Sequence, residues 1–198
     1  MKQRSPMVQP SAHVDTFVLD GLPPIEDWPV LLPAPRPYPL PDRLNVATVL
    51  LDDAVARGWG DRPCVRDPDH SWTYAELLEQ ANRMAHVLVD HGIVPGNRVL
   101  LRGGNAAWLV AAWFAVLKAG GVAVTTMPLL REPELKKIID KCRPSIALCH
   151  ERVAAPLEAV AGDMPVLRWG GADDLADRCA SSPSTFDNVD TAASDPAL

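Results

Sequence analysis

The sequence predicts an α/β fold, with a mainly parallel sheet, helices on both faces and a proline-rich extended leader in front of it. Two observations carry this prediction. From residue 98 onward, short apolar runs alternate with helical patterns at the spacing of strand–helix–strand units, which join parallel strands. Prolines number 20 in 198 residues, and ten of them fall within the first 41, so the leader differs in composition from the body.

Composition and charge limit the classes of function. Hydrophobic residues make up 47% of the chain and charged residues 22%, as in a soluble globular protein. The net charge of −6 favours neither nucleic acid nor an anionic membrane as a partner. The longest apolar run, residues 106–117, is shorter than the roughly 20 residues that span a bilayer, and no secretory signal follows the basic amino terminus. We therefore expect a cytoplasmic protein.

The cysteines predict reduced thiols rather than disulfides or a metal site. Cys64, Cys142, Cys149 and Cys179 form no C-x-x-C pair. The five histidines add neither H-E-x-x-H nor a clustered Cys/His spacing. We therefore assign no metal ligand.

The leader comprises residues 1–43. Within residues 32–41, proline alternates with other residues. Proline fixes its own φ and favours extended angles in the residue before it, so this stretch can form neither a helix nor a central strand. It can lie over a surface, and the alternative is a ligand for a proline-reading domain.

The body comprises residues 44–170 and opens with a helix that ends near residue 57, before Gly58. The apolar side of this helix consists of Ala47, Leu50, Leu51, Ala54 and Val55. Two short strands follow, over residues 63–66 and 70–73, around an Asp67-Pro68-Asp69 turn.

A helix over residues 74–91 has the clearest local signals. Thr73 and Glu76 form a capping box, in which each side chain accepts a hydrogen bond from the other residue's amide. Gly92 stands where a C-terminal cap is expected. The apolar stripe consists of Tyr74, Leu77, Leu78, Ala81, Met84, Ala85 and Leu88.

The remaining body alternates strands with helices. The predicted strands are 98–102, 122–126, 145–149 and 165–169. The predicted helices are 106–119, 131–142 and a weak one over 157–160. Helix 106–119 is apolar nearly all round, so we expect it to be buried on most sides, with Asn105 as its cap. Residues 171–198 form a loop-rich tail with one short helix near 173–179.

Two glycine-containing segments are candidate phosphate sites. Ligands of α/β sheets bind at the carboxyl ends of strands, and residues 102–105, Arg-Gly-Gly-Asn, lie between a strand and a helix N-terminus. The alternative is a tight turn, because G-x-G-x-x-G and G-x-x-x-x-G-K-[ST] are both absent. Lys118, before Gly120 and Gly121, could reach a phosphate, or could simply stabilise the last helical turn.

The other polar residues form no catalytic constellation. No nucleophile elbow G-x-S-x-G occurs. The acid pairs Asp52-Asp53 and Asp173-Asp174, and also His86, are expected on the solvated surface. Arg131 lies in a loop after a strand, where ligand-contacting residues gather, or is a surface arginine beside Glu132. We assign no catalytic residue.

Three motifs resemble those of the AMP-forming adenylating enzymes, the superfamily of acyl-CoA synthetases, luciferases and peptide-synthetase adenylation domains. Residues 72–77, Trp-Thr-Tyr-Ala-Glu-Leu, are similar to its Leu-Thr/Ser-Tyr-x-Glu-Leu motif. Residues 94–99 resemble its Val-x-x-Gly-Asp-x-Val turn, with Asn97 where aspartate is usual. Residues 117–128 are similar to its Leu-Lys-Ala-Gly-x-x-x-x-Pro motif. The resemblance covers about residues 44–170.

Within this superfamily, the leader and residues 127–131, Met-Pro-Leu-Leu-Arg, look similar to the benzoate and 2-aminobenzoate CoA ligases. The resemblance implies the first α/β subdomain of the ligase fold. It also implies that a small carboxylate, ATP and CoA give acyl-CoA, AMP and pyrophosphate through an acyl-adenylate, with Mg²⁺ as cofactor. Arg131 is the candidate residue on the CoA side.

The chain departs from the superfamily because the Ser/Thr/Gly-rich phosphate loop, the acidic magnesium ligand and the C-terminal lysine are missing from it. We therefore expect an N-terminal fragment, cut before the phosphate loop, that is inactive alone and binds no cofactor tightly.

On the fragment hypothesis we expect exposed apolar surface that favours self-association, with Trp108 or Trp113 more exposed than Leu77 or Leu88. One alternative is a free-standing, non-catalytic α/β binding or regulatory module. Another is a flavodoxin-like nucleotide or flavin binder, which the two tyrosines and the absent phosphate loop disfavour.

Overall fold

A four-stranded parallel sheet lies at the centre of the computed structural model, which describes residues 10–29, 41–171 and 174–198. The strands, in the order β4-β3-β5-β6 across the sheet, are β4 Val122–Thr126, β3 Arg98–Arg102, β5 Ile146–His150 and β6 Val166–Trp169. In register, Val99 of β3 lies opposite Ala123 of β4 and Ile146 of β5. The four predicted strands are confirmed, two of them with ends moved by one residue.

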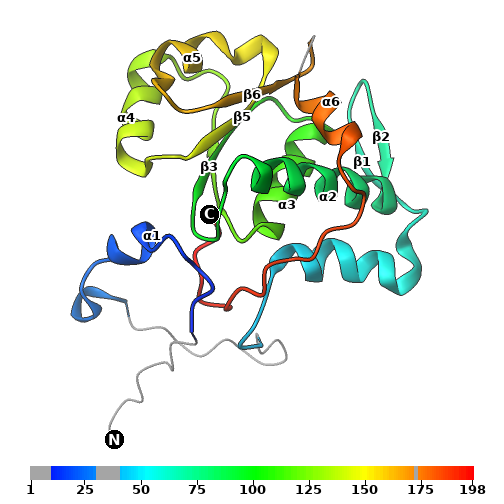
Figure 1. The fold of residues 1–198 in the computed structure, drawn as a ribbon, viewed down its shortest axis with the longest axis horizontal. Coiled ribbons are helices and arrows are strands. Elements are labelled where there is room, and N and C mark those ends of the chain that lie inside the picture. The colour runs from blue at the N-terminus through cyan, green and yellow to red at the C-terminus, as the bar shows by residue number, and fades with distance from the viewer. Residues whose placement is uncertain (1–9, 30–40, 172–173) are drawn as a thin grey trace, which may run out of the picture.

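Helices cover both faces of this sheet, as predicted (Figure 1). One face carries α2 Tyr74–Asp90, α3 Ala107–Lys118 and α6 Asp174–Ser181, and the other carries α4 Glu132–Cys142 and α5 Ala155–Ala161. Successive side chains of a strand point to opposite faces. Val99 and Leu101 therefore pack in the core cluster with α2 and α3, whereas Leu100 packs with α4 and α5.

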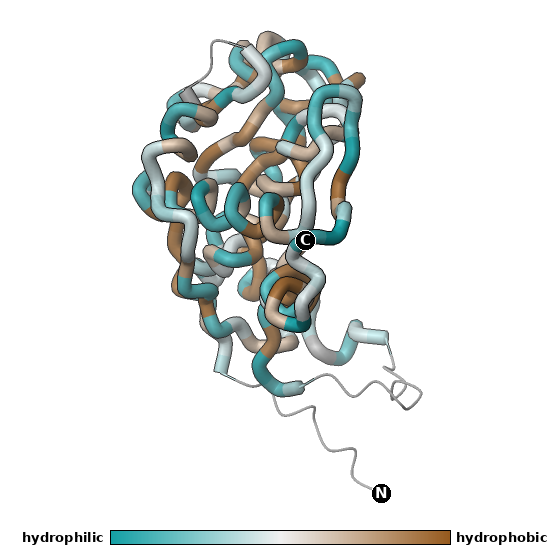
Figure 2. Tube along the Cα trace, turned by 90° about the vertical axis from the view of Figure 1, so that its right-hand side faces the viewer, coloured by the Kyte–Doolittle hydropathy of each residue, from teal (hydrophilic) through white to brown (hydrophobic). Residues whose placement is uncertain are grey.

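Helix α2 begins at the predicted residue and ends one residue before the predicted end, at Asp90. The Thr73 hydroxyl accepts a hydrogen bond from the Glu76 amide at 3.2 Å, and a Glu76 carboxylate oxygen accepts one from the Thr73 amide at 2.7 Å. Gly92 follows the helix at φ +81°, a conformation that side chains disfavour. Figure 2 shows the apolar segments gathered inside the body, with hydrophilic segments around the outside.

The first helical segment of the body differs from the prediction. Residues 48–59 contain two π-helical stretches, η2 Thr48–Asp52 and η3 Val55–Trp59. Ala47, Leu51 and Ala54 are buried as expected, but Leu50 is 52% exposed. A π-helix has wider turns than an α-helix, so the residues that share one face change. The strands β1 Pro63–Arg66 and β2 Ser71–Thr73 then pair antiparallel, as predicted.

Short helical turns occur in the leader and after β5. The leader contains α1 Phe17–Asp20 and the 3₁₀ turn η1 Ile25–Asp27, so residues 10–29 are not extended throughout. The proline alternation over 32–41 lies outside the described residues except for Pro41. The 3₁₀ turn η4 Glu151–Val153 precedes α5, which is longer than the predicted 157–160. Helix α6 confirms the short helix in the tail.

Helix α3 is buried against α2 but leaves one side partly open. Trp108 and Trp113 are half-buried, whereas Leu77 and Leu88 are fully buried, which confirms the predicted order of exposure. No helix among residues 10–29, 41–171 and 174–198 combines the length and the apolar character that crossing a bilayer requires.

Leader and tail meet at the amino-terminal end of the sheet (Figure 1). The Ala12 amide donates a hydrogen bond to the Asp195 carboxylate at 3.0 Å, although 183 residues separate the two. The tail also passes the end of α3, where the Val189 amide donates to the Lys118 carbonyl oxygen at 2.9 Å. The body is therefore fastened at this end by both terminal segments.

Candidate functional site

The carboxyl end of β3 holds a buried arginine. Arg102 is 1% exposed, and its guanidinium donates four hydrogen bonds of 2.8–2.9 Å to backbone carbonyl oxygens. The acceptors are Met127, Pro128, Leu130 and Val153. Burial lowers the pKa of Arg102, and the nearby charge of Arg131 adds to this effect. Arg102 is therefore not available to a phosphate, because its donors fix the loop after β4.

The two glycines after Arg102 form a turn shaped by packing. A Cβ on Gly103 would lie 2.8 Å from a ring carbon of Trp169, so only glycine lets this indole pack against the turn. Gly104 is exposed and faces open space. These contacts support the tight-turn interpretation over a phosphate cradle.

The N-terminus of α3 is already occupied by a carboxylate of the chain itself. Asp67 accepts a hydrogen bond from the Ala107 amide at 2.7 Å. The same carboxylate accepts bonds from the Asp69 and His70 amides, and these contacts, above all the one from Ala107, lower the pKa of Asp67 to about 2. The prediction that Asn105 caps this helix was wrong, because Asp67 reaches the free amide from the β1–β2 turn.

Lys118 is fully buried and paired. Its ammonium lies 2.7 Å from both carboxylate oxygens of Asp52 and 3.1 Å from the Asn188 side-chain oxygen. Burial lowers the pKa of Lys118, and the bond with Asp52 opposes that change. The expectation of a solvated Asp52 was wrong. Lys118 joins η2, α3 and the tail and does not face a ligand.

Arg131 stands at the start of α4, beside the loop that Arg102 fixes. It is exposed, and its backbone amide donates to the Glu134 carboxylate at 3.0 Å. In the loop before it, Met127 is 63% and Leu129 81% exposed. We call residues 127–131 the carboxyl-edge loop. This loop exposes two apolar side chains and one cation, and the hydrogen bonds from Arg102 fix its backbone. It is the candidate ligand-contacting surface.

The remaining polar candidates do not form a site. His86 is half-buried rather than fully solvated, because its Nε2 lies 2.7 Å from the Thr185 carbonyl oxygen and its ring packs on Phe186. Burial raises the pKa of the Cys149 thiol to about 12, so this cysteine is unreactive. Within the described ranges, no three His, Cys, Asp or Glu side chains gather as metal ligands. Residue 173 lies outside those ranges.

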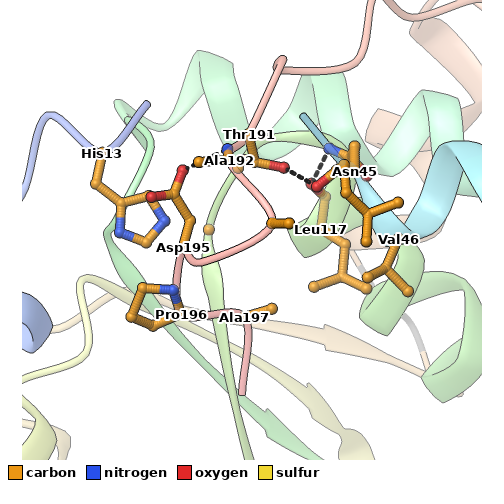
Figure 3. A pocket seen from close by; sticks show the side chains of 13 residues that line it. His13, Asn45, Val46, Leu117, Thr191, Ala192, Asp195, Pro196 and Ala197 are labelled. Atoms are coloured by element: carbon orange, nitrogen blue, oxygen red, sulfur yellow. Dashed lines mark hydrogen bonds between the residues drawn. The ribbon is translucent and has the colours of Figure 1, made fainter. Parts of the chain in front are cut away.

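A small cavity separates leader and tail at the opposite end of the sheet (Figure 3). Its volume of about 50 Å³ is far below the roughly 300–1,000 Å³ of ligand pockets. His13 and Asp195 lie side by side in its wall, and Asn45, Leu117 and Thr191 form much of the rest. The cavity is therefore too small for a nucleotide.

Sequence reasoning missed the structural roles of three residues in these regions, although Arg102 was named as part of a candidate phosphate site. Arg98 and Arg102 flank the apolar centre of β3, and a charge at either end of a buried strand is a visible signal that its partners must be found. Asp67 was assigned to a turn only. Its second role as cap of α3 depends on how the hairpin packs on the helix, which no local pattern records.

Comparison with known proteins places this geometry among adenylating enzymes. Residues 52–197 match the model of the family described as AMP-binding enzyme. Malformin synthetase mlfA of Aspergillus brasiliensis is 32% identical over 124 residues, which are 62% of this chain and 2% of the synthetase. A medium/long-chain-fatty-acid and 3-oxocholest-4-en-26-oate CoA ligase of Mycobacterium marinum is 37% identical over 105 residues, 53% of this chain and 18% of the ligase.

The fold likeness to a solved structure is extensive. The anthranilate CoA ligase AuaEII, solved in complex with anthranoyl-AMP, superposes with a TM-score of 0.73 at 24% identity. The match covers 79% of this chain and 31% of that ligase. The chain thus spans less than a third of each of these three proteins.

Proposed function

The chain belongs to the AMP-binding enzyme family, and from this premise we propose that it forms the amino-terminal subdomain of an AMP-forming ligase that activates a carboxylic acid. The observation that carries the proposal is the order of three motifs along one fold. They lie at the start of α2, at the turn before β3 and at the α3–β4 turn, and the family model spans all three.

The proposed reaction has two steps. An oxygen of the substrate carboxylate attacks the α-phosphorus of ATP, which forms an acyl-adenylate and releases pyrophosphate. A thiol then attacks the acyl carbon and releases AMP. We assign the thiol to CoA, because the leader of this chain is similar to the start of benzoate and 2-aminobenzoate CoA ligases. The printed names of the relatives include both CoA ligases and peptide synthetases, which supports the shared first step more strongly than the second.

Three groups that could have held a triphosphate are already engaged within the chain. The N-terminus of α3 is filled by Asp67, and Lys118 is buried in its bond with Asp52. The donors of Arg102 are taken up by carbonyl oxygens. We infer that the 198-residue chain does not form acyl-adenylate by itself.

Aromatic acids are the proposed substrate class. The support is the likeness of the leader and the carboxyl-edge loop to benzoate and 2-aminobenzoate CoA ligases, together with the fold likeness to a ligase named for anthranilate.

The decisive test compares the chain with the longer reading frame. If the coding sequence after codon 198 continues into Thr-Ser-Gly-Thr-Thr-Gly-x-Pro-Lys, the protein of that frame should release pyrophosphate from ATP and Mg²⁺ with benzoate or 2-aminobenzoate, and the 198-residue chain should not. Each missing donor of transition-state stabilisation costs about 100- to 1000-fold in rate. Turnover by the short chain would contradict the fragment hypothesis. Absence of the downstream motif would favour a non-catalytic module.

Arg131 is the proposed CoA-side residue. We expect millimolar CoA to shift the amide resonances of the carboxyl-edge loop in a ¹⁵N-labelled chain, because an exposed guanidinium pairs weakly with phosphate in water. Arg131→Ala should abolish these shifts, whereas the matched control Arg152→Ala, on exposed η4, should keep them. Equal shifts in both variants would argue against this assignment.

The half-buried side of α3 supports the expected self-association. Trp108, Trp113 and Phe114 are only partly covered by the described residues. Light scattering at micromolar concentration should detect oligomers, and a hydrophobic dye should bind. A monodisperse monomer that binds no dye would favour the module over the fragment.

A further inference from the structure

The leader is fastened to the body at a small number of defined contacts. We call residues 10–16 and 190–197 together the leader–tail clasp. The Val14 and Asp15 amides both donate to the Pro95 carbonyl oxygen, at 2.9 and 3.0 Å. The Ala12 amide donates to the Asp195 carboxylate at 3.0 Å. These bonds hold the leader in one position against the turn before β3.

His13 lies in the middle of the clasp and is 9% exposed. Neither of its ring nitrogens has a hydrogen-bond partner among the described residues. Figure 3 shows the imidazole beside the Asp195 carboxylate, at the edge of the 50 Å³ cavity. A buried ring without acceptors favours its neutral form, because an imidazolium would bury two N–H donors with no oxygen to accept them.

The carboxylates that face His13 are already engaged. Asp195 accepts bonds from the Ala12 and Ala192 amides. Asp15, on the leader itself, accepts bonds from the side chains of Asn97 and Arg98 and from the Phe17 amide. Both can attract a positive imidazole at a distance. Neither, as placed, offers it a hydrogen bond.

The backbone of the leader packs closely against Gly96. A Cβ on Gly96 would lie 2.1 Å from the Asp15 carbonyl oxygen and 3.0 Å from the Cβ of His13. Gly96 has φ +90°, so both its conformation and the contact require glycine. This close packing fixes the backbone next to the imidazole against the body as long as the leader is docked.

We propose that His13 makes leader docking depend on pH, so that the clasp is closed while the imidazole is neutral and opens when the imidazole takes up a proton. Opening would uncover the turn before β3 and the start of the sheet. The side chain thus acts as a proton-sensitive latch between the leader and the body.

The direction of the pH effect on docking follows from the balance between burial of the His13 ring and the charges near it. Burial lowers the pKa of His13 below its usual 6.5, and the attraction of Asp195 and Asp15 only partly opposes this. The docked state therefore binds fewer protons than the released state below pH 6.5, and docking weakens as pH falls. Asp15 and Asp195 have pKa values below the usual 3.8, so the charges of these two carboxylates are constant in this window.

Amide exchange of the leader tests the latch in the full chain. Between pH 6.5 and the docked pKa, the protection factors of the Val14 and Asp15 amides should fall by up to about tenfold per pH unit, as proton linkage requires. His13→Phe has no titrating group and keeps an aromatic ring, so its protection should stay level down to pH 5. His13→Gln provides a second, polar variant if phenylalanine packs poorly.

Two controls separate the latch from general loss of structure. Amides in the centre of β3 should keep their protection in every variant at every pH. His91→Gln, a histidine outside the clasp that contacts the Val87 carbonyl oxygen, should retain the wild-type fall. Level protection in the wild type from pH 7.5 to 5, no protection at pH 7.5, or the same fall in both His13 variants would each overturn the proposal.

Discussion

Strand β3 carries a buried arginine at each end, and the two are satisfied in different ways. Arg98, at the start, bonds the Asp15 carboxylate and the carbonyl oxygens of Gly96, Cys142 and Arg143. Its guanidinium also lies 4.5 Å from the centre of the Phe17 ring. Arg102, at the end, bonds four carbonyl oxygens, and no ion pair with it occurs among the residues described.

The difference shows that the type of acceptor decides whether a buried arginine depends on the side chains of the segment it binds. Backbone carbonyls are present in every residue, so Arg102 fixes the path of the carboxyl-edge loop without fixing its side chains. Arg98 depends on the identity of Asp15 and Phe17 in the leader. The first arrangement leaves a surface free to vary, and the second ties one particular segment to the sheet.

Arg102→Met should have the largest effect on stability. It leaves buried carbonyl oxygens without donors, and hydrogen bonds to charged groups contribute about 1.5–3 kcal/mol each, so unfolding free energy should fall by at least about 3 kcal/mol. Urea denaturation measures this change. Arg102→Lys should recover only part of it, because one ammonium cannot reach all four oxygens, and full recovery would mean that charge alone matters.

Arg98 and the Asp15 carboxylate should show strong energetic coupling in their contributions to stability. In a double-mutant cycle of Arg98→Met and Asp15→Asn, we expect a coupling energy of about 1–3 kcal/mol, because the two groups share one partly buried bond. The matched cycle of Arg102→Met and Asp15→Asn should give additive effects. Coupling of similar size in both cycles would erase the distinction between the two arginines.

Asp67 offers the opposite case, an anion that satisfies backbone amides. Asp67→Asn keeps one side-chain oxygen that can accept from the helix but loses the carboxylate charge, so stability at pH 7 should fall by about 1–2 kcal/mol. With a folded pKa of about 2 against 3.8, the contribution of Asp67 is complete above pH 3.8 and is lost as pH falls toward 2. The wild type and variant should therefore converge at acidic pH, and a constant gap down to pH 2 would contradict the assignment.

Asn97→Asp should give the smallest effect. The Asn97 amide donates to the Asp15 carboxylate at 2.7 Å, so aspartate there replaces a donor with a second negative charge. Arg98 beside it reduces the repulsion, and we expect a loss of about 0.5–1 kcal/mol. In an Asp15→Asn background the same Asn97→Asp change should cost less, because the like charge opposite it is gone, and thermal melts measure both differences. A stabilised single variant would show that the leader tolerates the more usual aspartate.

The sequence predicted the elements well because their signals are local. The capping box of α2 and the apolar alternation from β3 to β6 each depend on residues within a few positions of one another. The π-helical turns of residues 48–59 were not predictable in this way. There, Asp52 pairs with Lys118, which lies on α3 and is distant in the sequence. Leu50, on the same irregular turns, is exposed although its spacing predicted a buried position.

The candidate site was less accessible to sequence reasoning because its parts are distant along the chain. Arg131 was found through its position after a strand. The support of its loop by Arg102, and the closing of the α3 N-terminus by Asp67, appear only when β3, β4 and the hairpin come together. Residues chosen as phosphate ligands became structural because folding supplied them with partners from their own chain.

The bond between Ala12 and Asp195 has a consequence for biosynthesis. The two partners are 183 residues apart, so at translation rates of about 5–20 residues per second the leader waits roughly 10–40 s for its acceptor to be made. The Pro95 carbonyl is made about halfway through that interval and gives the leader a first attachment. Every strand of the sheet, from β3 to β6, has therefore been synthesised before the clasp can close.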